Sequence, residues 1–253
     1  MTEEYPARPE PFWVNYVTLL EERPALISVD AGWMSALGFG DAETLLGIEI
    51  PFHAKGDGEI VSRDELPVLQ EIAEAIEAEL PEEFAHLVAR RYGAGKMVLY
   101  VYAAHPDDIA AIVSELLEDS DYEPRSFELQ DPEWAHYRDV LCPDDIVWQN
   151  ISNDDLRAQM AGHGDNPALM RRIDHVALFP DRDGAGDYAA RVEEIGFEVE
   201  AFSDKDDPDF PIAVEFWRDD APDGLNEVTG LLVEMAREYV GRYDGWGARV
   251  VAG

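Results

Sequence analysis

Two kinds of hydrophobic spacing alternate along the chain, and they predict a mixture of strands and amphipathic helices. The runs FWVNYVTLL and PALISVD are rich in β-forming residues and are separated by the polar EERP, which predicts a hairpin. The runs EFAHLVARRY and KMVLYVYAA flank GAG and predict a second hairpin. LLGIEIPFHA and YEPRSFELQ are two further runs typical of strands.

Helical spacing follows the first strands. In DELPVLQEIAEAIEAEL, the apolar positions that share one face are Leu69, Ile72, Ala73, Ile76 and Leu80. In DDIAAIVSELLEDS, they are Ile109, Ile112, Val113 and Leu116. The segment DPEWAHYRDVL predicts a short helix with Asp131 as N-cap and Pro132 at its first position. We therefore expect residues 1–145 to form an α+β domain, an antiparallel sheet with helices packed on one face.

The second part of the chain begins with a segment of weak periodicity. We predict a connector over residues 146–168, with one short helix because Ser152 and Asp155 have capping-box spacing. Three strands are then predicted, over RRIDHVALFP, FEVEAFSD and FPIAVEFWRD. DGAGDYAARVEEIGF predicts a helix between the first two of these strands, with Gly196 as its stop.

The last helix and the tail complete a second domain over residues 169–253. The helix is expected to start near Asn226, and its predicted buried stripe is Val228, Leu231, Leu232, Met235 and Tyr239. We predict that Gly241 ends this helix and that Asp244 and Gly245 form a tight turn. Trp246 would start a final strand and cover the helix end, with its indole N–H reaching a backbone carbonyl. The order β-α-β-β-α-β is the ferredoxin-like arrangement.

Charge changes the picture of what such a fold binds. The 253 residues carry a net charge of −36, and the acidity is spread over the whole chain rather than confined to a tail. Such a surface repels nucleic acid, which relies on Lys and Arg for its phosphates, and attracts basic proteins. Adaptation to solubility or to a salt-rich habitat is the alternative explanation. About 46% of residues are apolar, which is ample for two cores.

Location is read from what the sequence lacks. No run of 18 apolar residues predicts a membrane span, and MTEEYPARPE has no features of a signal peptide. A single cysteine, Cys142, excludes an internal disulfide framework and fits a reducing compartment. We therefore expect a cytoplasmic protein.

The sequence offers few candidates for chemistry. None of the six histidines has a His or Cys partner at zinc-ligand spacing, YGAGK lacks the full phosphate-loop spacing, and no G-x-S-x-G motif occurs. We therefore predict no catalytic, cofactor or metal site. His175 lies in a predicted strand, where a hydrogen-bonded structural role is favoured over acid–base chemistry.

Two surfaces remain as candidates for binding. Glu227, Glu234 and Glu238 share one outer face of the last helix, which indicates either a row that binds a basic partner or a solvated helix face. The alternative function is a small-molecule-binding protein or enzyme, with a site in the N-terminal domain or between domains. Its pocket would be lined by aromatic and polar residues that could equally be core and interface: Trp13, Trp33, His53, Tyr100, Tyr102 and Trp134.

The tail carries a family resemblance. A β-α-β-β-α block opened by RRIDHVALFP, with AARVEEIGFEVE inside it and a helix followed by YDGW, resembles the regulator of ribonuclease E activity B family over roughly residues 168–253. The most specific element is Tyr243, Asp244, Gly245 and Trp246, for which the spacing indicates a structural role. YVYAAHP and DPEWAHYRDVL resemble an uncharacterised bacterial domain family.

The resemblance implies an acidic protein inhibitor. Members of the regulator family bind ribonuclease E outside its catalytic chemistry and so alter RNA turnover. The charge argument indicates the same class of partner, because an acidic surface can compete with RNA for basic segments. This chain differs from the simple family form by its large N-terminal domain, so another basic RNA-binding protein is an alternative partner.

Overall fold

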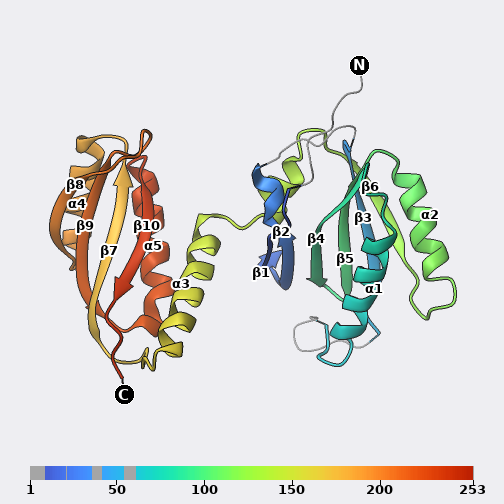
Figure 1. Cartoon of the computed structure of the whole chain (residues 1–253), viewed down its shortest axis with the longest axis horizontal. Coiled ribbons are helices and arrows are strands. Elements are labelled where there is room, and N and C mark those ends of the chain that lie inside the picture. Colours follow the sequence, from blue (N-terminus) through green and yellow to red (C-terminus); the bar gives the residue numbers. More distant parts are fainter. Residues whose placement is uncertain (1–8, 21, 36–41, 54–60, 253) are drawn as a thin grey trace. The chain divides into compact units, whose positions relative to one another are not determined.

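The chain divides into two compact α+β units, residues 1–142 and 143–253 (Figure 1). The structure is a computed structural model, and it describes residues 9–20, 22–35, 42–53 and 61–252. Both sheets are antiparallel throughout their described pairings and carry helices, which confirms the predicted fold class.

The first unit is built on a six-stranded sheet with the order β1-β2-β4-β5-β3-β6. Its strands are β1 (Trp13–Leu20), β2 (Arg23–Asp30), β3 (Thr44–Pro51), β4 (Ala85–Gly93), β5 (Lys96–Ala103) and β6 (Arg125–Gln130). β1 pairs with β2 and β4 with β5, so both predicted hairpins are confirmed. At the β4–β5 turn, Ala94 and Gly95 have φ of 53° and 77°, the left-handed pair that matches the twist of a two-residue hairpin.

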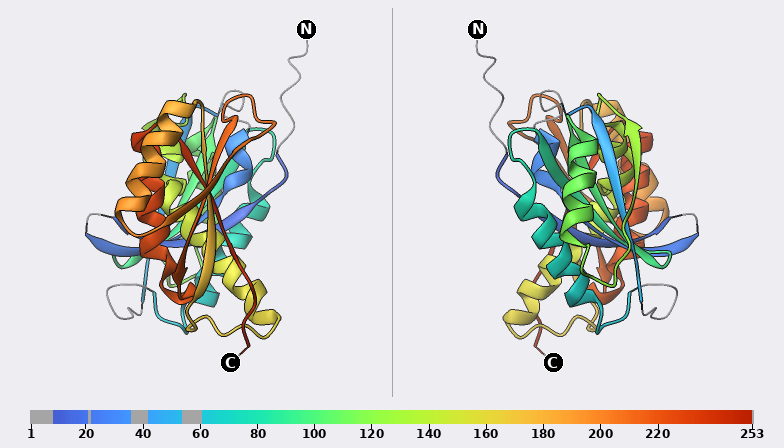
Figure 2. Two further views of the ribbon diagram at one scale, coloured as in Figure 1. Left: turned by 90° about the vertical axis from the view of Figure 1, so that its left-hand side faces the viewer. Right: turned by 90° about the vertical axis from the view of Figure 1, so that its right-hand side faces the viewer.

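Two helices cover one face of this sheet, α1 (Leu66–Glu79) and α2 (Pro106–Leu116), as the right-hand view of Figure 2 shows. Leu69, Ala73 and Ile76 are buried along α1, as their spacing predicts. They join one core with the alternate residues of β3 and β5, including Ile48 and Leu99. The helical period of α1 and the two-residue period of the strands therefore meet at a single interface.

A cluster of aromatic side chains is buried in the first unit apart from the α1–α2 core. Trp134 stacks on Tyr102 with ring centroids 4.0 Å apart, and Trp33 lies 5.3 Å from Trp134. Two short helical turns contribute to this cluster, a 3₁₀-helix (Ala31–Ser35) and a π-helical turn (Tyr137–Leu141). Trp33, Tyr102, Trp134 and Tyr137 are all fully buried, and two of them, Trp33 and Tyr137, come from these short turns.

The prediction of a regular helix starting at Pro132 is wrong. The carboxylate of Asp131 accepts hydrogen bonds from the backbone N–H groups of Ala135 (2.8 Å) and His136 (2.9 Å), four and five residues ahead. An N-cap would instead bind residues two or three ahead. Trp134 has a φ of 52°, which interrupts any helix before that point. The helical turn therefore starts late and widens into the π-helical segment.

The second unit confirms the predicted β-α-β-β-α-β order. Its elements are β7 (Arg171–Phe179), α4 (Arg182–Glu194), β8 (Glu198–Asp204), β9 (Ile212–Asp220), a 3₁₀-helix (Pro222–Gly224), α5 (Leu225–Glu238) and β10 (Arg242–Ala248). The sheet order is β10-β7-β9-β8, so the first and third strands of the motif lie in the middle. The core of this unit lies between the sheet and its helices and includes Phe179, Tyr188, Phe216 and Leu232.

The segment predicted as a connector contains an 18-residue helix, α3 (Asp145–Gly162), which packs beside α5. The side chain of Asp144 caps it by accepting from the N–H of Val147 at 2.8 Å. Ser152 does not act as a cap, because its hydroxyl donates to the carbonyl of Trp148 one turn back. The helical pattern is hidden in the sequence because the buried positions of α3 include a polar residue, Asn153.

The end of α5 also differs from the prediction. Val240, with a φ of 59°, takes the left-handed position after the helix, and the N–H of Gly241 closes the motif by donating to Ala236 at 2.8 Å. Gly241 is needed for a different reason. A Cβ there would lie 2.2 Å from the ring of Phe179. In α4 the equivalent left-handed position is Gly196, with a φ of 92°, as predicted.

Candidate functional site

The family-motif residues, Tyr243 to Trp246, lie within strand β10. The predicted tight turn is wrong, since the pairing with β7 continues and shifts by one residue between Tyr243 and Gly245. This shift is a β-bulge, in which Gly245 has a φ of 121°. Asp244 is the extra residue and is exposed, whereas Tyr243 and Trp246 pair with residues on one face of β7. The bulge therefore places both aromatic side chains on the helix-covered face of the sheet.

Tyr243 is tied to His175 in the core. The tyrosine hydroxyl lies 2.7 Å from Nδ1 of His175, whose ring stacks on Phe216 with centroids 5.4 Å apart. His175 is 1% exposed. Burial, helped by the nearby Arg218 cation, lowers the pKa of His175 to about 3. At neutral pH this imidazole is uncharged and closed off from solvent, which fits the structural role that the sequence favours.

Trp246 is tied to α3 by a polar network. Its indole N–H donates to Oδ1 of Asn153 at 2.7 Å, so the predicted bond to a backbone carbonyl is wrong. The same oxygen accepts from Gln149 (2.8 Å), and the amide nitrogen of Asn153 donates to Thr229 (2.8 Å) and Asn226 (3.0 Å). Asn153 is fully buried and joins β10, α3 and α5. Sequence reasoning missed it, because an asparagine in a polar segment carries no signal of burial.

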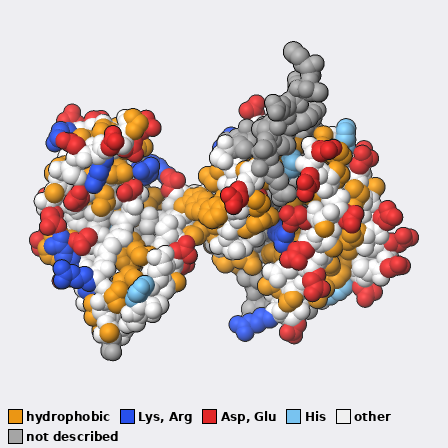
Figure 3. All heavy atoms as spheres, in the orientation of Figure 1, with side chains coloured by type: hydrophobic (Ala, Val, Ile, Leu, Met, Phe, Trp, Pro, Cys, Tyr) orange, Lys and Arg blue, Asp and Glu red, His pale blue; other side chains and the backbone are white. Residues whose placement is uncertain are grey.

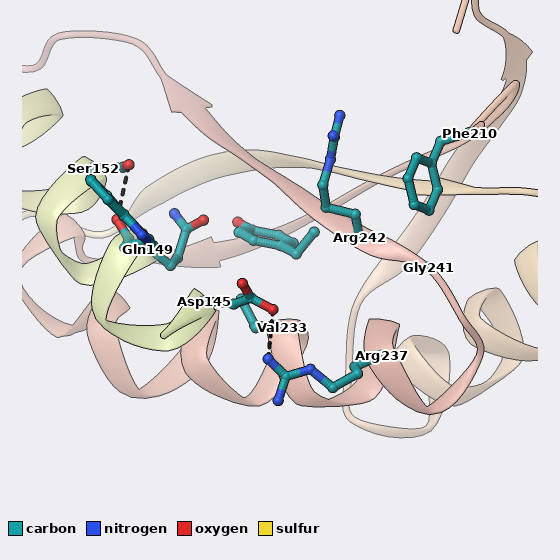
Figure 4. Close-up of a pocket in the computed structure, with 10 residues that line it drawn as sticks. Asp145, Gln149, Ser152, Phe210, Val233, Arg237, Gly241 and Arg242 are labelled. Carbon is teal, nitrogen blue, oxygen red and sulfur yellow. Dashed lines mark hydrogen bonds and ion pairs between the residues drawn. The ribbon is translucent and has the colours of Figure 1, made fainter. Parts of the chain in front are cut away.

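A groove of about 440 Å³ opens beside Tyr243, between α3, α5 and β10 (Figure 4). Asp145 and Arg237 face each other across it in an ion pair of 2.5 Å. On another side, the guanidinium of Arg242 lies 5.2 Å from the ring centre of Phe210. The charged groups of the groove are already paired, so it offers a contact surface with aromatic, amide and ionic character.

The three glutamates predicted to bind a partner lie on α5 and are all exposed. Neither a hydrogen bond nor an ion pair joins Glu227, Glu234 or Glu238 to any residue that the structure describes. Leu231 falls within the same row and is 45% exposed, which corrects its predicted place in the buried stripe. The buried arc of α5 instead includes Thr229, with the result that Leu231 turns outward.

The six aromatic and polar residues predicted to line a pocket in the N-terminal domain do not form one. Three of them, Trp33, Tyr102 and Trp134, fill the aromatic core described above. His53 stacks on Tyr122 (4.2 Å between centroids), and Trp13 lies under the guanidinium of Arg90 (5.0 Å). Tyr100 lines a hollow formed by described residues of the first unit.

Within residues 9–20, 22–35, 42–53 and 61–252, no three His, Cys, Asp or Glu side chains cluster as metal ligands would. None of the helices in that part of the chain has both the length and the hydropathy of a membrane span.

The geometry of the second unit defines a class of protein: a ferredoxin-like domain with an added helix, a bulged YDGW strand and an exposed acidic helix face. Residues 150–248 match the family model described as Regulator of ribonuclease activity B, which indicates a regulator of ribonuclease activity. Residues 12–142, more than half of the chain, match the family of unknown function DUF695, and the chain belongs to this family. Both predicted resemblances are thereby confirmed. A search among curated proteins found no match.

Proposed function

We propose that the protein is a non-enzymatic regulator that binds a basic segment of an RNA-processing nuclease such as ribonuclease E and inhibits it by competing with RNA. The single observation that carries the proposal is the row of three exposed carboxylates on α5, Glu227, Glu234 and Glu238, none of them paired with a described residue. The family match of this unit supports the same class of function.

The row has the composition of a docking surface for a basic segment. Its three carboxylates are fixed on one rigid helix, and Leu231 adds an apolar contact between them. Because none of the three forms an ion pair with a described residue, these carboxylates are available to Lys and Arg of a partner, although Arg237 and Arg191 interact electrostatically with Glu234 and Glu238. Binding would then combine electrostatic steering with one buried leucine, a favourable arrangement for a rapid but salt-sensitive complex.

The surface charge also supports a protein partner over direct RNA binding. On the face seen in Figure 3, Asp and Glu side chains are spread over the first unit, whereas the second unit shows Lys and Arg side chains among its acidic ones. A net charge of −36 opposes the approach of a phosphate backbone and favours the approach of the Lys- and Arg-rich segments that bind RNA.

The test compares two triple variants with the same change in net charge. One replaces the row on α5 (Glu227→Gln, Glu234→Gln, Glu238→Gln), and the control replaces three exposed acidic residues on α4 (Asp183→Asn, Asp187→Asn, Glu193→Gln). Affinity of the full chain for a basic RNA-binding segment of ribonuclease E is measured by calorimetry at several salt concentrations. At about 0.5 kcal/mol per exposed charge, the α5 variant should bind about tenfold more weakly.

The control defines what would contradict the proposal. It should lose much less affinity than the α5 variant, because long-range charge alone is screened within about 8–10 Å at physiological salt. Equal losses in the two variants would show that the row has no specific role. Absence of salt-sensitive binding by the unmodified protein would exclude this partner.

A further inference from the structure

A basic hollow of about 570 Å³ lies on the first unit, and the proposed nuclease regulation gives it no role. It is formed where the β1–β2 and β4–β5 hairpins approach the π-helical turn. Lys96 and Tyr100 of β5 line it, whereas Met97 and Leu99 between them belong to the core under α1 and α2. Because side chains alternate along a strand, the hollow lies on the face of the sheet opposite to those helices.

The charge of the hollow is opposite to that of the protein. Its basic lining residues are Arg23, Arg91, Lys96 and His136, and among the described residues that line it there is no Asp or Glu. The whole chain has 55 Asp and Glu against 19 Lys and Arg, so a cavity lined by this many basic residues is unexpected. Lys96 pairs with Glu49 nearby.

Two consecutive arginines of β4 differ in whether their charge is compensated by a described residue. Arg90 points to the helix-covered face, where its guanidinium pairs with Glu77 at 2.6 Å and covers the ring of Trp13. Arg91 points to the hollow and forms neither an ion pair nor a hydrogen bond with any described residue. Its Nε atom is nevertheless buried. A half-buried guanidinium without a partner is costly unless a ligand or solvent satisfies it.

Two further polar groups lack partners beside Arg91. Nε2 of His136 is buried without a hydrogen bond to the described part of the chain. The Tyr100 side chain, only 4% exposed, also has no such bond from its hydroxyl, and its ring centre lies 5.6 Å from that of His136. Burial lowers the pKa of His136; the Asp131 carboxylate opposes this shift and the Arg91 cation adds to it. Three potential donors therefore converge on one cavity.

We propose that this hollow binds the oxyanion group, a carboxylate or a phosphate, of a small molecule. The Arg91 guanidinium pairs with the oxyanion, and the Tyr100 hydroxyl and the Nε2–H tautomer of His136 donate to it. Apolar walls from Leu20 and Pro24 are placed to contact the carbon part of the ligand. The volume lies in the range of small-molecule sites. This binding is independent of the acidic row on α5.

The experiment uses the full chain and two probes, sodium phosphate and sodium acetate, against sodium chloride of equal ionic strength. Melting temperature and calorimetric heat are followed as each salt is added. Arg91→Gln is compared with the matched neighbour Arg90→Gln, which removes the same charge from the other face of the same strand. Far-UV circular dichroism confirms folding, and Arg91→Lys together with Tyr100→Phe replaces Arg91→Gln if that variant does not fold.

We expect phosphate or acetate to raise the melting temperature saturably where chloride does not, and the tighter probe identifies the oxyanion. Loss of a charge-assisted hydrogen bond should weaken the apparent affinity of Arg91→Gln by about tenfold, whereas Arg90→Gln should melt earlier but keep its affinity. Tyr100→Phe should weaken binding by a smaller factor. An equal response to chloride, or equal affinity in Arg91→Gln and the unmodified protein, would overturn the proposal.

Discussion

Acidification is expected to destabilise the second unit through one buried residue, His175. Burial lowers the pKa of His175 from its ordinary value of 6.5 to about 3 in the folded protein. Between these two pH values, the unfolded chain binds a proton at this position and the folded chain does not. The free energy of unfolding therefore falls with decreasing pH, by about 1.4 kcal/mol per pH unit. The contribution is fully present above the unfolded pKa and declines until the pH reaches the folded pKa.

The size of the effect at an accessible pH follows directly. From pH 6.5 to pH 5.0, the loss from this residue is about 2 kcal/mol. Other groups titrate over the same range, and partial neutralisation of the acidic surface opposes the loss. The relevant quantity is therefore the difference in stability between the unmodified chain and His175→Asn, which cannot be protonated but keeps an acceptor near Nδ1.

The assay is denaturant unfolding of both proteins at pH 7.5, 6.5, 5.5 and 5.0. The stability advantage of the unmodified chain over His175→Asn should shrink by about 2 kcal/mol across this series. Tyr243→Phe is a useful control, since it removes the hydroxyl 2.7 Å from His175 but leaves the imidazole buried. It should keep the pH dependence. Parallel curves for the unmodified chain and His175→Asn would refute the assignment of the effect to burial of this imidazole.

Two further pairs of substitutions test the structure around the motif. Asn153→Ala should lower the free energy of unfolding by about 3 kcal/mol, because buried partners lose their hydrogen bonds; Ser152→Ala, on the exposed side of the same helix, should change it by less than about 0.5 kcal/mol. A similar loss of unfolding free energy in Asn153→Ala and Ser152→Ala would contradict the stabilising role assigned to the hydrogen bonds of Asn153. Val240→Gly should raise the melting temperature, with a gain of about 1 kcal/mol from relief of left-handed strain, and Gly196→Val should lower it. A change of melting temperature in the same direction for Val240→Gly and Gly196→Val would contradict the backbone argument.

The regular elements could be predicted from the sequence because their apolar side chains follow the period of the element. Leu69, Ala73 and Ile76 follow one another at spacings of four and three residues on α1, and each is buried. The same logic failed for Leu231, which has the right spacing but turns outward. A threonine, Thr229, occupies the core in a way that hydrophobicity alone would not suggest, bonded to the carbonyl of Leu225 at 2.9 Å.

The candidate site was harder to predict because its important contacts are polar or depend on the backbone. The burial of Asn153 depends on three elements that meet only in the folded chain. The residues of the bulge, Asp244 and Gly245, are also the residues that favour a tight turn, so the sequence does not distinguish the two structures. Arg90 and Arg91 are adjacent and chemically identical, and only the tertiary structure distinguishes the paired guanidinium from the unpaired one.

The position of α3 has a consequence for how this module can be inherited or moved between proteins. The first unit ends at Cys142, and Asp144 already caps the helix that supplies the partner of Trp246. A fragment cut at residue 169, where the strand pattern starts, would lack α3 and leave the indole N–H and Thr229 without their bonds to Asn153. A gene fusion that preserves a working module is therefore expected to join just before Asp144. The cap residue lies outside the matched span of 150–248, so a fragment designed from that span alone would lack it.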